Sequence, residues 1–337
     1  MIRKKILVTG ATGFVGSHLC ERLIELGHAD VYATKRYHLS RLDNVESFYS
    51  SVNWIDCNLT DPIAVARLFD DLVPDVIFHC AAESFVSPSW AHPINYMYVN
   101  YNATVNILEQ IVRSGCKTTI HIPGSGEEYG DIKQSELPIN VKTVMNPVNP
   151  YAVSKVAQDL IASVYHSSYG VRVIRTRSFN HEGPRRERVF GISWYAFQIA
   201  RMELGLQKRV LRVGHLEDKR NFTHVSDMVD AYISAVEKCE AGKLYLVGNS
   251  DPSSIYTFAD AISGLQKLTA ASDFTVSQDK KFIRPTQVPF LIADTSDFEH
   301  QTGWRPKKSF ENILEDTLLY WRDRLARNPD TANVEAL

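Results

Sequence analysis

The sequence has few cysteines, and their arrangement argues against two classes of protein. The five cysteines, Cys20, Cys57, Cys80, Cys116 and Cys239, are odd in number, far apart and without a Cys-x-x-Cys or Cys/His cluster. Neither a disulfide framework nor a zinc site is therefore supported, and we predict no bound metal. Reduced and mostly buried thiols are expected, as is typical of a cytoplasmic protein.

Long apolar runs and a net charge of either sign are also missing. No apolar run is long enough to span a membrane, and the one that follows residues 1–5 is too short for a signal peptide. With 37 basic and 39 acidic residues, the net charge of −2 offers no general attraction to nucleic acid or to anionic lipid. What remains, 337 residues of which 44% are apolar, is an ordinary globular composition with room for a sizeable core.

Short apolar segments alternate with helical patterns through the first half of the chain. The expected strands are residues 6–9, 31–34, 52–55, 76–79 and 118–122. Between the first two, Val15, Leu19 and Leu23 recur at helical spacing, and the pattern ends at Gly27. This alternation favours βαβ units. We therefore predict an α/β fold with a Rossmann-type, doubly wound parallel sheet.

The pattern loosens after about residue 180, where prolines interrupt further short strands and helices. We predict that residues 1–180, together with about 220–245, form the Rossmann domain. Residues 181–327 are expected to form a smaller, mixed α/β C-terminal lobe. Residues 328–337 lack periodicity and are expected to form a loose tail.

Three glycines lie where the first strand ends and the first helix begins. Such a turn lets a pyrophosphate approach the backbone, and the unpaired N–H groups of the helix then face the phosphates. We predict a dinucleotide site here, against the alternative of a plain strand–helix turn. The predicted cofactor-binding residues of the turn are Gly10, Thr12, Gly13, Phe14, Val15 and Gly16. The G-x-x-G-x-x-G spacing resembles that of the extended short-chain dehydrogenase/reductases.

The residues after the second strand indicate which dinucleotide binds. An acidic residue there would bind the ribose 2′-hydroxyl and repel a 2′-phosphate, but this chain has Lys35 and Arg36. Two cations favour NADP. The alternative is that both side chains are solvated at the surface and that the cofactor is NAD. Further cofactor contacts are predicted after the third and fourth strands, at positions similar to the superfamily's adenine-edge loop and strand end: Asp56, Asn58, Leu59, Ala81 and Ala82.

A tyrosine and a lysine four residues apart on a helix share one face. At Tyr151 and Lys155, the ammonium could lower the pKa of the phenol and hold the nicotinamide ribose. The pair could then move a proton to or from a carbinol oxygen during hydride transfer. Pro150 marks a helix start immediately before the pair. Tyr129 and Lys133 have the same spacing, but they lie just beyond the fifth strand, so we take that pair as coincidence.

The fifth strand ends in three polar side chains that could carry chemistry. Ser125 could hydrogen-bond a substrate oxygen beside Tyr151, since reactive groups gather at the carboxyl edge of a parallel sheet. Glu127 could act as a base on a carbon made acidic by a neighbouring ketone. The alternative for both glutamates is a solvated rim, and we expect Glu128 there.

Four segments resemble the GDP-mannose 4,6-dehydratase family. They are NPYAVSK (149–155), SFNHEGPRR (178–186), GHLEDKR (214–220) and RPTQVP (284–289). The resemblance implies that the C-terminal lobe binds a GDP-linked sugar, with Asn180, Arg220 and Arg284 on the GDP. Taken alone, each of these arginines could equally be a surface cation. The substrate-binding residues predicted in all are Ser84, Asn180, Glu182, Arg185, Arg220 and Arg284, although Ser84 could instead cap a strand end.

The resemblance implies a 4,6-dehydratase that converts GDP-mannose to GDP-4-keto-6-deoxymannose. Tyr151 would take the 4-hydroxyl proton as hydride leaves C4, and Glu127 would remove the C5 proton. Water would leave from C6, and the returning hydride would regenerate the cofactor. Ser125 would hold the intermediate, in place of the family's threonine, while Tyr151 and Lys155 would also contact the cofactor.

Other features leave alternatives open. The segment from Ser125 to Gly130 is closer to the sister GDP-4-keto-6-deoxymannose reductases, which also have a Glu at the position of Glu127, so this residue alone does not decide between the two reactions. Gln287 stands where the dehydratases have Glu. A 4-keto reductase, or a C4 dehydrogenase of a GDP-hexose or GDP-heptose, is therefore the first alternative. A non-catalytic dinucleotide-sensing protein is a remote one. The Arg–Ser–Ser stretch that reaches a neighbour's cofactor in dehydratase tetramers is missing after Arg36, so we predict a homodimer.

Overall fold

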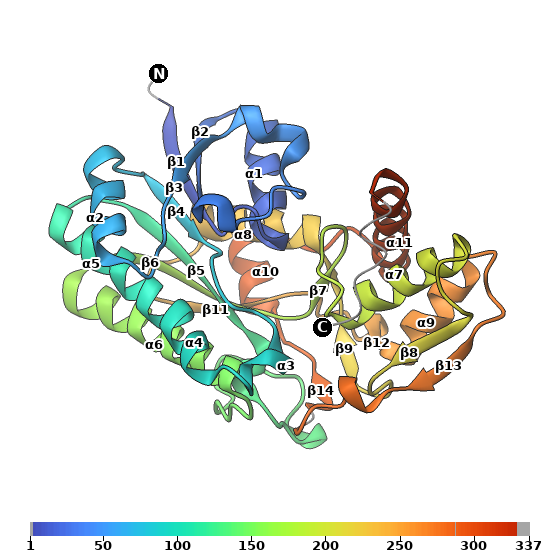
Figure 1. Ribbon diagram of the computed structural model, residues 1–337. Coiled ribbons are helices and arrows are strands. Elements are labelled where there is room, and N and C mark those ends of the chain that lie inside the picture. The colour runs from blue at the N-terminus through green and yellow to red at the C-terminus, as the bar shows by residue number, and fades with distance from the viewer. Residues whose placement is uncertain (1–2, 287, 329–337) are drawn as a thin grey trace.

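A seven-stranded parallel sheet forms the centre of the protein in a computed structural model, which describes residues 3–286 and 288–328 (Figure 1). Its strand order is β11-β6-β5-β4-β1-β2-β3. The strands are β1 (Lys4–Thr9), β2 (Ala29–Lys35), β3 (Asn53–Asp56), β4 (Val76–His79), β5 (Thr119–Ser125), β6 (Arg172–Ser178) and β11 (Leu244–Val247). Because the chain runs outward from β1 in both directions, the predicted doubly wound Rossmann-type fold is confirmed.

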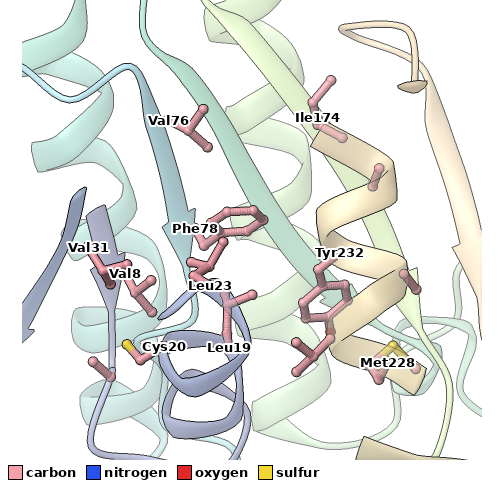
Figure 2. Packing of buried hydrophobic residues seen from close by; sticks show 14 of the residues in the cluster. Val8, Leu19, Cys20, Leu23, Val31, Val76, Phe78, Ile174, Met228 and Tyr232 are labelled. Atoms are coloured by element: carbon pink, nitrogen blue, oxygen red, sulfur yellow. The ribbon is translucent and has the colours of Figure 1, made fainter. Parts of the chain in front are cut away.

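Alternate residues of the central strands β1 and β4 enter two separate cores. Leu7 and Ile77 pack with α2 (Pro62–Asp71), α5 (Ala103–Ser114) and α6 (Pro150–Tyr169). Val8 and Phe78, the next residues along, pack with α1 (Phe14–Leu26), α8 (Val225–Lys238) and α10 (Ser296–Thr302) on the opposite face. Figure 2 shows the second core, with side chains of α1 and α8 meeting those of the strands. Burial of both faces explains the continuous apolar strand patterns.

Two of the seven strands, β6 and β11, were not among the five predicted segments. The pattern of β6 is broken by Arg172, Arg175 and Arg177. Arg175 and Arg177 are nevertheless enclosed, because both form ion pairs with Asp159 of α6. Arginines that are neutralised by a neighbouring helix can thus occupy a covered strand, which a hydropathy pattern does not reveal.

The C-terminal part of the chain forms a second lobe, in which helices surround a separate apolar core. Its residues include Trp194, Phe197, Phe310 and Trp321. The helices are α7 (Gly191–Glu203), α9 (Phe258–Lys267) and α11 (Phe310–Arg327). Three small sheets accompany them: β7 (His181–Glu182) with β10 (Thr223–His224), β8 (Val210–Val213) with β13 (Thr275–Gln278), and β12 (Ile255–Thr257), β9 (Lys219–Asn221) and β14 (Phe290–Leu291). The predicted mixed α/β composition of this part is observed.

The second lobe is formed from discontinuous segments of the chain. Between its elements, the chain returns to the main sheet for α8, β11 and α10. The domain boundaries themselves stay a prediction, and the expected loose tail, from residue 329 onward, lies outside the described residues. The short helices are α3 (Val86–Ser89), α4 (Pro93–Met97), a π turn (Tyr98–Asn102) and 3₁₀ turns at Tyr37–Leu39, Glu46–Ser51, Gly126–Tyr129, Gln134–Glu136, Pro252–Ser254 and Lys280–Phe282.

Residues 3–286 and 288–328 contain no helix that is both long and apolar enough to cross a membrane. All five cysteines are free, and Cys20, Cys57 and Cys239 are buried.

Candidate active site

A cavity of about 940 Å³ lies at the carboxyl edge of the main sheet. The ends of β1, β4, β5 and β6 converge there, since Thr9 is in register with His79 and Ser125 with Ser178. This edge is where doubly wound sheets bind their ligands. The lining includes every residue predicted to contact the cofactor: Gly10, Thr12, Gly13, Phe14, Val15, Gly16, Arg36, Asp56, Asn58, Leu59, Ala81, Ala82, Tyr151 and Lys155.

The glycine turn brings the backbone close to this cavity. Gly10 has a φ of 65°, and a Cβ there would lie 2.7 Å from the backbone of Ala81. A Cβ on Gly16 would lie 2.3 Å from the carbonyl oxygen of Gly10. Gly13, the N-cap of α1, offers no side-chain acceptor to the first N–H groups of the helix. These donors and the space above them fit the pyrophosphate of a dinucleotide.

Three cations, Lys35, Arg36 and Arg41, line the cavity at the end of β2. Arg36, which was predicted, is joined by Arg41, which was not. Lys35 is committed to another group, because its Nζ lies 2.5 Å from Oδ1 of Asp56. Of the two cations that favoured NADP in the sequence, only Arg36 is therefore a candidate to contact a 2′-phosphate. Arg41 from the following loop is a second candidate.

Helix α6 presents Tyr151 and Lys155 to the cavity from its first two turns. Nζ of Lys155 donates to the carbonyl oxygen of Pro123 at 2.6 Å and also to Oε1 of Gln158. Burial lowers the pKa of Lys155 from its usual value. Its contacts tie the ammonium to β5 and to its own helix.

Burial raises the pKa of Tyr151 to about 12, and interaction with the Ser125 hydroxyl opposes this shift. The Lys155 ammonium contacts Pro123 and Gln158, and the expectation that it lowers the pKa of the phenol stays a prediction. A substrate hydroxyl in the cavity would meet the phenol beside Ser125.

The 3₁₀ turn after β5 places Glu127 on the same cavity. The hydroxyl of Ser125 accepts a hydrogen bond from the backbone N–H of Glu127 at 3.2 Å and so caps this turn. The Glu127 side chain is 13% exposed. Its Oε2 accepts a hydrogen bond from Nδ2 of Asn149 at 3.0 Å, and its Oε1 lies 4.0 Å from Nη1 of Arg284. The four predicted catalytic residues, Ser125, Glu127, Tyr151 and Lys155, thus line one cavity.

Glu128 is buried, and the expectation of a solvated rim was wrong. Its Oε1 accepts a hydrogen bond from the backbone N–H of Ser125 at 2.7 Å, and its Oε2 lies 2.6 Å from Nε of Arg177. The side chain is fully enclosed because it supplies a counter-charge for Arg177 on β6. Tyr129 is also fully buried and accepts a hydrogen bond from Arg177 at 2.9 Å, behind the cavity.

The predicted substrate-binding residues divide into two groups. Ser84, Asn180 and Arg284 line the cavity. Glu182, Arg185 and Arg220 lie outside its lining, each with partners in the protein. Glu182 faces Arg186 at 3.7 Å, Arg185 donates to Glu21 of α1 at 2.8 Å, and Arg220 donates to the carbonyl oxygens of Lys219 and Val288. The assignment of these three residues to the substrate site stays a prediction, and Arg220 interacts with Glu127 and Arg284 of the cavity lining.

Arg186, which the sequence reasoning passed over, lines the cavity. Its guanidinium lies 3.4 Å from the ring centre of Phe190 and 4.7 Å from that of Phe14. The preceding residue, Arg185, has a φ of 67°, so the two neighbouring side chains diverge. The motif SFNHEGPRR contained this signal, but sequence spacing did not show which arginine turns inward. Gln287 lies outside the described residues.

The described residues, 3–286 and 288–328, include no group of three or more His, Cys, Asp or Glu side chains placed to hold a metal ion.

The sequence matches relatives along nearly its whole length. A family model described as GDP-mannose 4,6 dehydratase matches residues 7–317. The chain is 28% identical to GDP-6-deoxy-D-mannose reductase of Pseudomonas aeruginosa, across 96% of this chain and 98% of that protein. It is also 28% identical to GDP-mannose 4,6 dehydratase 1 of Arabidopsis thaliana, across 93% of this chain and 88% of that protein.

Solved structures share the fold. RMD from Pseudomonas aeruginosa in complex with NADPH superposes with a TM-score of 0.80 at 28% identity, and the match covers 96% of this chain and 100% of the RMD chain. UDP-glucose 4-epimerase of Thermus thermophilus in complex with NAD has a TM-score of 0.81 at 26% identity, covering 94% and 99% of the two chains.

Proposed function

The chain belongs to the GDP-mannose 4,6-dehydratase family, and from this premise we propose that it is a GDP-sugar 4,6-dehydratase that converts GDP-mannose to GDP-4-keto-6-deoxymannose. The observation that carries the proposal is the position of Glu127. A partly enclosed carboxylate shares one cavity with Ser125, Tyr151 and Lys155. Oxidation or reduction at C4 needs only Ser125, Tyr151 and Lys155, whereas elimination also needs a base that removes the C5 proton.

Tyr151 would begin the reaction by taking the proton of the 4-hydroxyl. A nicotinamide dinucleotide bound along the glycine turn would supply the hydride acceptor at C4 and return the same hydride to C6, with no net redox change. Lys155 would hold the nicotinamide ribose, and the Ser125 hydroxyl would hydrogen-bond the C4 oxygen. Holding substrate and phenol together in an enclosed cavity supplies much of the rate enhancement.

Glu127 would then act on the 4-keto sugar. The ketone acidifies C5, and the carboxylate of Glu127 removes the C5 proton and passes it to the hydroxide that leaves from C6, which departs as water. The C5–C6 double bond formed in this step receives the hydride at C6 and a proton from solvent at C5, while Tyr151 releases the 4-hydroxyl proton to solvent. The product is one water lighter than the substrate.

We propose NADP as the cofactor, on the charges of Arg36 and Arg41 at the cavity end beyond β2. Replacing either arginine by serine should weaken NADP binding by about tenfold, since one charge-assisted hydrogen bond to the 2′-phosphate is worth about 1.5 kcal/mol. Binding of NAD, which has no 2′-phosphate, should stay within about twofold. Titration of each variant with both dinucleotides checks this, and equal losses for the two would contradict NADP selectivity.

Incubation of the protein with GDP-mannose and a catalytic amount of NADP tests the reaction itself. Mass spectrometry should detect a product that has lost one water, and the absorbance of reduced nicotinamide should not accumulate. Reduction of all the added NADP without loss of water would instead favour a C4 dehydrogenase, whereas a 4-keto reductase would leave GDP-mannose unchanged and would consume NADPH only with a 4-keto sugar. The reductase is the second candidate because of the relative from Pseudomonas aeruginosa. A panel of GDP-hexoses and GDP-heptoses would define the sugar.

We further propose a homodimer built on helix α6. Val153, Leu160 and Val164 project from one side of this helix and are each nearly half exposed. An apolar stripe of this kind is typically covered by a partner, and a second copy would present the same stripe to it. The cytoplasmic location expected from the sequence stays a prediction.

A further inference from the structure

Asn149 forms two hydrogen bonds that join the two chemical parts of the site. It is the N-cap of α6, and its Oδ1 accepts from the backbone N–H of Ala152 at 2.8 Å. Its Nδ2 donates to Oε2 of Glu127 at 3.0 Å. The residue is only 5% exposed. One amide therefore contacts both the start of the helix that carries Tyr151 and the carboxylate assigned as the base.

The orientation of this amide is determined by its partners. The cap position requires an acceptor facing the helix N–H groups, so the oxygen must point toward Ala152. The nitrogen then has to face Glu127, where it donates to the carboxylate. The reversed orientation would place an amide oxygen against a carboxylate oxygen and an N–H group against another N–H group. Capping thus selects the orientation that also holds the carboxylate.

The other charged groups near Glu127 lie on different elements. Nη1 of Arg284 is 4.0 Å from Oε1, on the side of the carboxylate opposite to Asn149. Burial lowers the pKa of Arg220 on β9, and the charge of Glu127 opposes that shift. Tyr151, on α6, is a further titratable neighbour, and besides burial the charge of Glu127 raises the pKa of its phenol. Of these contacts, only the one to Asn149 is a short hydrogen bond to a buried neutral group.

We propose that Asn149 is a positioning residue for Glu127, fixing the base relative to Tyr151 through the N-terminus of α6. The inference rests on the proposed dehydratase function. Tyr151 and Glu127 act on adjacent carbons of one sugar, so their separation has to be maintained between the two steps. A displacement of about 1 Å in such a site can reduce a rate by roughly 100-fold.

Two substitutions separate positioning from capping. Asn149→Asp keeps an N-cap acceptor but replaces the donor by a second carboxylate next to Glu127. Asn149→Ser also keeps a good N-cap, but its side chain is too short to reach Glu127. Both variants should therefore retain α6, and C4 oxidation in a single turnover should remain within about threefold of wild type. Elimination should fall by roughly 10- to 100-fold at pH 7.

The pH profile of elimination shows whether the slower elimination arises at the Glu127 carboxylate. In Asn149→Asp, two adjacent carboxylates disfavour the ionised form of each other. Because elimination requires the Glu127 carboxylate, the acid limb of its pH profile should move to higher pH. Reduced nicotinamide should accumulate before product, and the incorporation of solvent deuterium at C5 should slow in step with elimination.

The outcomes distinguish this inference from the proposed function. If oxidation and elimination fall together with an unmoved acid limb, Asn149 is only a helix cap and the inference is overturned. Should Asn149→Asp fail to fold, parallel losses of both steps in Asn149→Ser would overturn it equally. Glu127→Gln serves as the reference: if that variant still eliminates water, the dehydratase proposal fails, whatever the Asn149 variants do.

Discussion

Tyr151→Phe should reduce turnover of GDP-mannose by roughly 10²- to 10⁴-fold, the usual contribution of a positioned acid or base. The phenol is the group on α6 that faces the cavity beside Ser125, and the substitution removes only its oxygen. Cofactor affinity should change by less than about threefold, because the ring and the glycine turn remain. Steady-state kinetics together with dinucleotide titration measure both quantities.

Tyr129→Phe is the matched control for this variant. Tyr129 is fully buried and is held by Arg177, so loss of its hydroxyl should cost about 1 kcal/mol of stability and leave the chemistry largely intact. A Tyr151→Phe variant with undiminished turnover would remove Tyr151 from the proposed mechanism. The remote alternative of a dinucleotide-sensing protein would be favoured if the wild-type protein bound the dinucleotide but turned over no GDP-sugar.

Glu127→Gln should stop the reaction after its first half. Glutamine keeps the size of the side chain and can accept the hydrogen bond from Asn149, but it cannot take a proton from C5. Elimination should therefore slow by roughly 10²- to 10⁴-fold, while C4 oxidation continues at close to the wild-type rate. Up to one equivalent of reduced nicotinamide should accumulate in each active site, which rapid-mixing absorbance detects.

The contrast with Tyr151→Phe makes this result specific. Tyr151→Phe blocks both halves of the reaction, so no reduced nicotinamide forms, whereas Glu127→Gln blocks only the second. Undiminished overall turnover in Glu127→Gln would contradict the dehydratase and favour a reductase or a C4 dehydrogenase. Both of these need Ser125, Tyr151 and Lys155, but neither needs a base at C5.

The sequence predicted the parts of the site that depend on local rules. Gly10, Gly13 and Gly16 line the cavity, and at Gly10 and Gly16 only a residue without a Cβ fits so close to the neighbouring backbone. Tyr151 and Lys155 face the same cavity because Pro150 and the cap at Asn149 set the start of their helix. For Gly16 and for the start of the helix, the relevant atoms lie within a few residues of one another along the chain, whereas the backbone nearest to Gly10 belongs to Ala81.

Predictions about single charged side chains were less successful. Glu128, expected at a rim, is buried against Arg177 from a different strand. Arg185 pairs with Glu21 of α1, while Arg186 turns into the cavity. Each outcome depends on a partner far away in the sequence, and the periodicity around the residue contains no trace of that partner.

By itself, the sequence determined the doubly wound α/β fold, the glycine turn and the helix that presents Tyr151 and Lys155. Hydrophobic period, helix caps and steric limits at glycine act over short stretches of chain, so they can be read without coordinates. Only the tertiary structure decided which neighbouring charges reach the cavity, and that Asn149 meets Glu127. Such choices depend on the cost of burying a charge, which is offset by whichever opposite charge or hydrogen-bonding group the fold brings within reach.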